Sequence, residues 1–351
     1  MKKLYLVELL RFVSSMSVLI YHYKIFFFQF NGFLELNVNN QLNQLPLNLL
    51  INLFYKYGDY GVQMFWCISG FIISYVYLNR EKVTGSNFFL NRFSRLYPLH
   101  FITLILILVI QMLSKKLTGE YQLFDFNDLY HFILNLFFVS GWGFQNGLNF
   151  NQPIWSVSIE LIAYFFFFVT LRYIKNYDFK FLIFFYILLM FIDKIFSPPN
   201  MNDNILSCLI FFISGAIVYF LMKKTKKKLF IIFSMVLLIL TFIGNFKIFM
   251  FCPAILMVVI SLEEKLIKFI NKPFFSMMGN VTYSTYLLHA PYSIFLILLF
   301  KDNIEIYLNP IFFGFYFISL ILISSIVYVY IEKKSQTKIR SFYANAIKKI
   351  K

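Results

Sequence analysis

Charged residues are scarce in this chain of 351 residues. Only 14% of the residues are Asp, Glu, Lys or Arg, whereas 60% are hydrophobic and the mean hydropathy is +0.72. A soluble domain carries roughly 25% charged residues. Apolar runs of about 20 residues, long enough to cross a bilayer, recur along nearly the whole sequence. The composition therefore argues against a soluble enzyme and predicts a polytopic membrane protein.

Cysteine is also rare, and its placement argues against a disulfide framework or a metal site. Cys67, Cys208 and Cys252 lie inside or at the edges of apolar segments, with no paired spacing. Such positions are typical of small buried hydrophobic side chains. We expect no metal and no tightly bound cofactor. The first apolar run follows Met1-Lys2-Lys3 directly and lacks a small-residue cleavage site, so we expect a retained span.

Basic residues outnumber acidic ones by 32 to 16, and they lie in short loops between the apolar runs. In a ten-span arrangement, alternate loops and both termini hold 24 basic residues, against six on the other side. This asymmetry follows the positive-inside rule and predicts cytoplasmic termini and a cytoplasmic 223–228 loop. It also accounts for the net charge without a nucleic-acid partner. The predicted spans lie near 4–28, 58–79, 96–113, 154–171, 179–193, 205–222, 229–245, 248–262, 277–300 and 310–331.

One apolar segment, 129–143, is too short to span a bilayer and ends in Gly141-Trp142-Gly143. Counting it as an eleventh span would place the 223–228 loop outside, so we predict a short re-entrant or interfacial helix on the outer side. The expected fold is an all-α integral membrane protein with about ten transmembrane helices. Residues 1–332 form one transmembrane domain in this reading, and 333–351 form a basic cytoplasmic tail.

The first span carries three ionisable residues, Glu8, Arg11 and His22. Each costs roughly 2.5–3.5 kcal/mol within a membrane, so a function is the default hypothesis. Arg11 and His22 are eleven residues apart, which places them within about 20° of one helix face and about 16 Å apart along it. Glu8 precedes Arg11 by one turn and can pair with it. We predict a stripe facing a polar cavity. The alternative is a structural ion pair with a hydrogen-bonded histidine.

Two arginines, Arg92 and Arg95, stand at the inner end of the third span. Arginines three residues apart share a helix face, and their forked hydrogen bonds suit phosphates. The alternative is that they only anchor the topology.

The fourth span begins with Trp155-Ser156-Val157-Ser158-Ile159-Glu160. Glu160 and His22 both lie about six residues from the outer ends of their spans, and a carboxylate beside a histidine makes it a better general base. Ser69, in a Ser-Gly pair within the second span, is a weaker candidate because such pairs often serve helix packing. His100 and His131 are expected to be interfacial.

Five blocks occur in order: ELLRFVSSMSVLIYH, GVQMFWCISGFII, RFSRLYPLH, PIWSVSIELIAYF and GNVTYSTYLLHAP. A last span ending in Tyr330-Ile331-Glu332 follows them. Together they resemble the membrane-bound acyltransferase-3 family, the integral-membrane O-acyltransferases of bacterial surface polysaccharides. The resemblance covers residues 8–332. The chain differs in having Glu8 where the family usually has Asp, and we expect none of the periplasmic hydrolase-like domain that some members carry.

The resemblance implies a cytoplasmic acyl-CoA donor, acetyl-CoA in the simplest case, and an acceptor hydroxyl across the membrane. It assigns Arg11 and His22 as an essential pair and Arg92 and Arg95 as donor contacts. Further site candidates are Glu160, His289, Glu8, Ser69, Trp155, Ser158 and Tyr283.

The expected function is acylation of an extracytoplasmic or lipid-linked glycan, such as O-antigen, capsule or exopolysaccharide, in the bacterial inner membrane. The alternative is a flippase or polymerase of the same pathways. That alternative would need a broad glycan cavity or a larger outer loop, and it would not need the arginine pair. The sequence leaves both direct transfer and an acyl-enzyme open.

Overall fold

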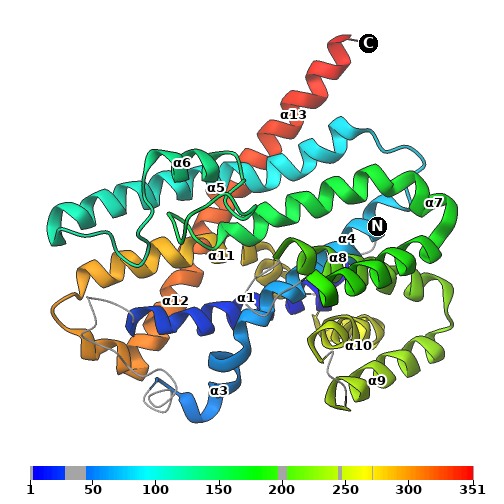
Figure 1. Ribbon diagram of the computed structural model, residues 1–351, viewed down its shortest axis with the longest axis horizontal. Helices are drawn as coiled ribbons and strands as arrows, with labels where there is room; N and C mark the ends of the chain where they lie inside the picture. The colour runs from blue at the N-terminus through cyan, green and yellow to red at the C-terminus, as the bar shows by residue number, and fades with distance from the viewer. Residues whose placement is uncertain (1–2, 28–44, 197–203, 244–246, 271, 351) are drawn as a thin grey trace. The chain divides into compact units, whose positions relative to one another are not determined.

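The computed structural model describes residues 3–27, 45–196, 204–243, 247–270 and 272–350 (Figure 1). Within these ranges the chain is helical and contains no strand, which confirms the predicted all-α fold. Much of the expected outer loop at 29–57 falls outside the described residues. The main helices are α1 (Tyr5–His22), α3 (Asn48–Tyr57), α4 (Gly61–Tyr77), α5 (Gly85–Thr118), α6 (Leu129–Leu136), α7 (Ile154–Phe196), α8 (Asn204–Lys224), α9 (Lys227–Ile243), α10 (Lys247–Ile270), α11 (Pro273–Leu299), α12 (Pro310–Val327) and α13 (Lys333–Ile350).

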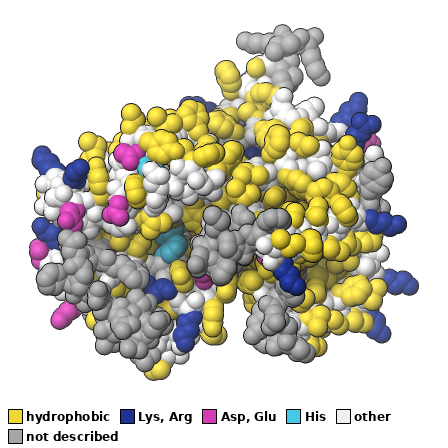
Figure 2. Space-filling view, in the orientation of Figure 1, with side chains coloured by type: hydrophobic (Ala, Val, Ile, Leu, Met, Phe, Trp, Pro, Cys, Tyr) yellow, Lys and Arg dark blue, Asp and Glu magenta, His cyan; other side chains and the backbone are white. Residues whose placement is uncertain are grey.

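Most of the helices coincide with apolar runs of the sequence, and among the described residues four helical segments are long and apolar enough to cross a membrane. These are Gly85–Thr118, Ile154–Asn176, Asn204–Lys224 and Pro310–Ala346. Large hydrophobic side chains lie exposed on them, including Val109, Met112 and Ile318. Figure 2 shows hydrophobic side chains over much of the visible face. Such a surface suits lipid and not water. The count of ten spans stays a prediction.

Helix α7 contains two predicted spans, 154–171 and 179–193, and it turns back on itself between them. The ring centroids of Phe166 and Phe185 are 5.5 Å apart. Residues 19 apart in a straight helix would be about 28 Å apart along the axis. The ring of Tyr173 likewise stacks on Phe181, with centroids 5.9 Å apart. The two arms therefore run antiparallel, although the helical conformation continues through the reversal.

The chain divides into two compact units, and α1, α7 and α11 each contribute to both. The first unit comprises Met1–Ser14, Tyr60–Thr84 and Ile159–Asn280, and the second comprises Ser15–Asp59, Gly85–Ser158 and Val281–Lys351.

In the first unit, α4 packs closely on α8 because a glycine of each helix lies against the backbone of the other helix. A Cβ at Gly70 would overlap the carbonyl oxygen of Phe212, and one at Gly215 would overlap that of Cys67. Close backbone approach at small residues is the usual means of helix packing in membranes.

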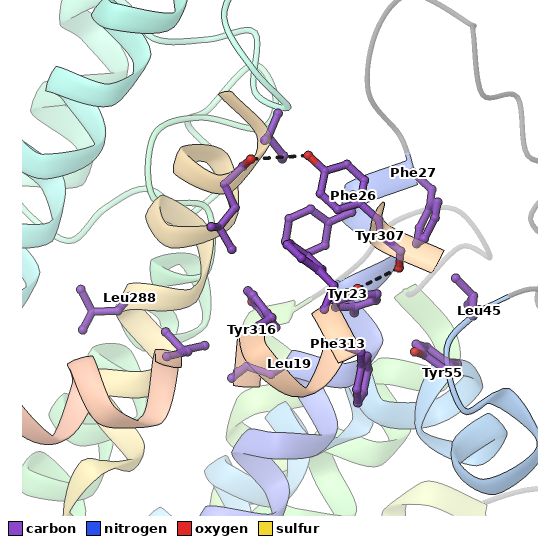
Figure 3. Packing of buried hydrophobic residues seen from close by; sticks show 14 residues of the cluster. Leu19, Tyr23, Phe26, Phe27, Leu45, Tyr55, Leu288, Tyr307, Phe313 and Tyr316 are labelled. Carbon is purple, nitrogen blue, oxygen red and sulfur yellow. Dashed lines mark hydrogen bonds between the residues drawn. The ribbon is translucent and has the colours of Figure 1, made fainter. Parts of the chain in front are cut away.

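In the second unit, an aromatic cluster holds the chain just after His22 (Figure 3). The Tyr23 hydroxyl donates to the carbonyl oxygen of Tyr307 at 2.9 Å, and Phe26 stacks on the Tyr307 ring with centroids 4.8 Å apart. The side chains of Tyr23 and Phe26 are fully buried. This packing, together with the edge-on contact between Tyr23 and Tyr316, fixes the end of α1 and so the position of His22.

Helix α6 has eight residues, or about 12 Å of helix, too short to be an eleventh span. Asp128 caps its start by accepting a hydrogen bond from the backbone N–H of His131 at 2.9 Å. That hydrogen bond lowers the pKa of Asp128 below its usual value, because it stabilises the carboxylate.

The C-terminal residues continue the last span. Helix α12 passes through one π-helical turn, Tyr328–Glu332, into α13 (Figure 1). The Arg340 side chain of α13 donates to Ser94 Oγ at 3.1 Å and to the carbonyl oxygen of Asn91 at 3.2 Å, both on α5. The segment 333–350, predicted only as a basic tail, is therefore a helix of the second unit that packs on α5.

Candidate active site

Two histidines meet in the second unit. His22, the last residue of α1, has its Nδ1 3.1 Å from Nε2 of His289 on α11. The two rings are nearly parallel, with an interplanar angle of 8° and centroids 5.2 Å apart. His289 is buried, whereas His22 is partly exposed. The structure thus pairs a residue of the first motif with a residue of the last.

The position of one proton follows from the next contact along this chain of hydrogen bonds. Nδ1 of His289 lies 2.5 Å from the carbonyl oxygen of Tyr286, and a carbonyl can only accept. A neutral His289 therefore carries its proton on Nδ1, and its Nε2 accepts from Nδ1–H of His22. His22 is left with the lone pair on Nε2, which is the form of imidazole that can act as a general base.

The local sequence explains why α11 holds His289 rigidly. Pro291 lies within the helix and has no N–H, so the carbonyl of Leu287 four residues earlier loses its helical partner. The side-chain amide of Asn151 donates to this carbonyl at 3.1 Å. Tyr286 directly precedes Leu287, and its side-chain hydroxyl lies 2.8 Å from Ser156 Oγ. These contacts tie the start of α7 to the helix turn that carries the Tyr286 carbonyl.

Glu8 and Arg11 form the ion pair that the sequence predicts, with Oε2 and Nη1 3.1 Å apart in the first unit. Gly279 on α11 makes room for it, because a Cβ there would overlap the Glu8 carboxylate. Glu263 accepts hydrogen bonds from the backbone N–H groups of Tyr5 and Leu6, at 2.7 and 2.8 Å, and so caps the start of α1. The helix that carries Arg11 is therefore anchored one turn before the pair.

Glu160 and Ser69, both predicted site residues, share one partner in the first unit. The Tyr164 hydroxyl donates to Oε1 of Glu160 at 2.6 Å and lies 3.3 Å from Ser69 Oγ. The predicted pairing of Glu160 with His22 stays a prediction. The described partner of His22 is His289, which the sequence suggested only as a further candidate.

Ser158 and Trp155 lie at the start of α7 in the second unit. Ser158 is buried; its Oγ accepts from the backbone N–H of Gly141 at 2.8 Å, and its carbonyl accepts from the Trp142 indole at 2.9 Å. Its Oγ also donates to the Trp155 carbonyl at 2.8 Å. Ser158 thus fastens the turn at 141–143 to the helix.

Arg92 and Arg95 are half-buried on α5 in the second unit, near the residues that receive α13. Arg340 of α13 binds Asn91 and Ser94, which flank Arg92. A third arginine therefore lies beside this part of α5. Sequence reasoning missed Arg340 because it lies beyond the matched blocks. Tyr283 anchors α11 to the same helix by donating to the Leu96 carbonyl at 2.7 Å.

The histidines expected to be interfacial are both buried. His100 donates from Nε2 to the carbonyl oxygen of Asn135 at 2.8 Å, at the end of α6. His131 Nδ1 lies 2.9 Å from the Asp128 carboxylate at the other end. These contacts hold α6 in place. Within the described residues, no group of three or more His, Cys, Asp and Glu side chains could hold a metal ion.

The fold and these buried polar groups define an all-helical membrane protein with a histidine pair suited to proton transfer. Residues 4–329 match the acyltransferase domain model of the acyltransferase-3 family, and the chain belongs to this family. It is also similar to the acyltransferase MdmB of Streptomyces mycarofaciens, at 27% identity over 111 residues. That match covers 30% of this chain and 27% of the relative, so it spans about a quarter of the relative's length. No solved structure matches the chain significantly.

Proposed function

We propose that this protein transfers an acyl group, acetyl in the simplest case, from cytoplasmic acyl-CoA to a hydroxyl of an extracytoplasmic or lipid-linked glycan. The observation that carries the proposal is the hydrogen-bond chain from the Tyr286 carbonyl through His289 to His22. It leaves a basic nitrogen on a side chain that is partly exposed inside a predicted span. An acceptor hydroxyl becomes a competent nucleophile when such a base takes its proton.

Arg11 has the role of an electrostatic partner in this proposal. Its guanidinium can stabilise either polar groups of the donor or the oxyanion that forms when the thioester carbonyl is attacked. The Glu8–Arg11 ion pair at 3.1 Å supports this role, since it holds the charge in one place on α1. Glu160 stays a proposed catalytic residue, as the carboxylate that assists the base.

Arg92 and Arg95 are the proposed donor contacts. CoA carries phosphates that cannot enter hydrocarbon, and forked guanidinium groups bind phosphates well. The acyl-pantetheine arm would then reach into the protein while the phosphates stay with the arginines. Acyl-CoA is thus a co-substrate in this proposal, and the acceptor is a surface glycan such as O-antigen, capsule or exopolysaccharide.

The proposed setting is the bacterial inner membrane, with ten spans and cytoplasmic termini. The basic asymmetry of the loops supports it, since 24 basic residues fall on the side assigned to the cytoplasm. The antiparallel arms of α7 also support it, because they contain the two predicted spans 154–171 and 179–193.

The test is mass spectrometry of surface glycans from cells with the gene, without it, and with His22→Ala in its place. We expect an acetyl or larger acyl increment with the wild type only. His22→Ala should lower acyl transfer by about 10²–10⁴-fold, the usual contribution of an acid–base group. Membrane expression must stay at the wild-type level. Normal acylation by His22→Ala would contradict the proposed role, and unchanged glycans in the deletion strain would contradict the function.

A further inference from the structure

The hydroxyl of Ser69 makes a contact unlike those of most helical serines in this protein. Serines in helices commonly donate to a carbonyl three or four residues earlier, as Ser214 does to Phe211 and Ser261 does to Met257. Ser69 on α4 instead lies 3.3 Å from the Tyr164 hydroxyl on α7. Its polar group is therefore directed away from its own helix and toward another.

The close backbone contact of this helix does not involve Ser69. Gly70 makes the close contact of this Ser-Gly pair, since its missing Cβ leaves space for the Phe212 carbonyl of α8. Ser69 is one residue away, about 100° around the helix, and it is partly exposed. The glycine serves packing and leaves the serine available for chemistry.

The hydrogen bonds from Ser69 run in one direction. Tyr164 has a single hydroxyl proton, and it donates that proton to Glu160 Oε1 at 2.6 Å. The Tyr164 oxygen can then accept from Ser69. The side chains at the two ends, Ser69 and Glu160, are partly exposed, whereas Tyr164 between them is buried. A proton can therefore pass from Ser69 to Glu160 through a link that is shielded from the surroundings.

We propose that Ser69 carries the acyl group as a serine ester between donor and acceptor. This proposal rests on the proposed function. In the first step the bond from Ser69 Oγ to the acyl carbon forms and the thioester C–S bond breaks. The Ser69 proton moves to Tyr164 while the Tyr164 proton moves to Glu160, and CoA leaves as the thiolate. The activated nucleophile and its proton relay have the general form used in covalent catalysis.

In the second step an acceptor hydroxyl attacks the ester carbonyl and the bond to Ser69 breaks. The proton of that hydroxyl passes to the general base of the proposed function. The Ser69 oxygen recovers its own proton from Glu160 through Tyr164. The base then releases a proton to solvent, where the CoA thiolate takes one up, so the cycle balances without any oxidation or reduction.

The experiment incubates full-length protein in detergent with radiolabelled acetyl-CoA and no acceptor. We expect an acetyl ester on the wild type, found by peptide mass spectrometry at Ser69. His22→Ala should form at least as much ester, because only its second step is blocked. Ser69→Ala should form none, and Ser69→Cys should form a thioester that neutral hydroxylamine cleaves. Tyr164→Phe should slow labelling by about 10²–10⁴-fold, as expected for a lost proton transfer.

Ser74→Ala is the matched control. Ser74 lies on the same helix and is fully buried, and its hydroxyl has no hydrogen-bond partner among the described residues, so its loss should leave labelling unchanged. The proposal is overturned if Ser69→Ala transfers acyl groups at the wild-type rate. The labelling result can also overturn it. If the wild-type preparation releases CoA when a glycan extract is added, but neither the wild type nor His22→Ala forms an ester, the proposal is wrong. A preparation that releases no CoA with any acceptor contradicts the proposed function itself.

Discussion

The Tyr286 carbonyl fixes one proton on His289, and that proton decides which nitrogen of His22 is basic. Two distances, 2.5 Å and 3.1 Å, carry this inference. His289 touches His22 and is not assigned to touch substrate, so it is a positioning residue. Its removal would let the His22 ring adopt either tautomer and other rotations, and only one of these forms presents the base.

We therefore expect His289→Ala to lower the rate of acyl transfer by about tenfold. One hydrogen bond of about 1.4 kcal/mol corresponds to that factor. His289→Gln should restore part of the activity, since its side-chain oxygen can accept from His22. The rate is measured as CoA release from acetyl-CoA, and thermal unfolding serves as the check on folding. Equal losses in the Ala and Gln variants would show a structural role only.

Gly279 allows a second residue-scale prediction. An added methyl group would overlap the Glu8 carboxylate, so Gly279→Ala should disturb the Glu8–Arg11 ion pair without altering either charged residue. Overpacking of this kind costs about 1–3 kcal/mol. We expect lower acyl transfer in membranes with normal protein content.

The control for Gly279→Ala is Gly314→Ala on α12. A Cβ at Gly314 meets nothing within 4 Å, and both positions are helical. The control should therefore be silent. If both variants keep full activity, the position of Glu8 does not matter for the reaction.

Among the elements, α5 brings together the proposed donor contacts and the docking site of α13. Arg92→Ala and Arg95→Ala should raise the acetyl-CoA concentration needed for half-maximal rate while leaving the protein in the membrane. Lysine at either position should rescue only partly, because it keeps the charge and loses the fork. Initial rates at limiting and saturating acetyl-CoA measure this effect.

Arg80→Ala provides the comparison for the α5 variants. Arg80 follows α4, lies over the Tyr77 ring and is assigned to a cytoplasmic loop, so it tests the role of a topology anchor alone. It should behave as wild type in the same assay. If the three alanine variants are indistinguishable at limiting donor, Arg92 and Arg95 are anchors too.

On the scale of the whole molecule, the ten-span arrangement predicts where reporters fused to the chain will lie. Fusions after residues 228 and 351 should report the cytoplasm, and one in the 301–303 turn should report the outside. Alkaline phosphatase and fluorescent protein fusions measure this directly. An extracytoplasmic signal after residue 228 would reverse the arrangement from that point and place His22 at the wrong depth.

Much of the fold could be predicted from sequence because hydrophobic runs and charged breaks are local properties. The helical class, the approximate positions of the apolar helices and a short helix within 129–143 follow from length and composition alone, although α5 extends beyond the predicted 96–113. The reversal within α7 was expected as a loop between two spans. The sequence could not show that the helical conformation continues through it, since that depends on the packing of Phe166 on Phe185.

The candidate site was predictable only within single elements. Glu8 and Arg11 are one turn apart, so their pairing follows from helix geometry. The sequence by itself thus determined the membrane class, the family and the candidate residues of the site. Only the tertiary structure decided that His22 meets His289, that Ser69 meets Tyr164, whose hydroxyl binds Glu160, and that Arg340 docks beside Arg92. Except for the Tyr164–Glu160 hydrogen bond, which spans one helix turn, these contacts join residues that are separated by 95 to 267 positions in the sequence. Periodicity along one helix carries no information about which other helix its face will meet.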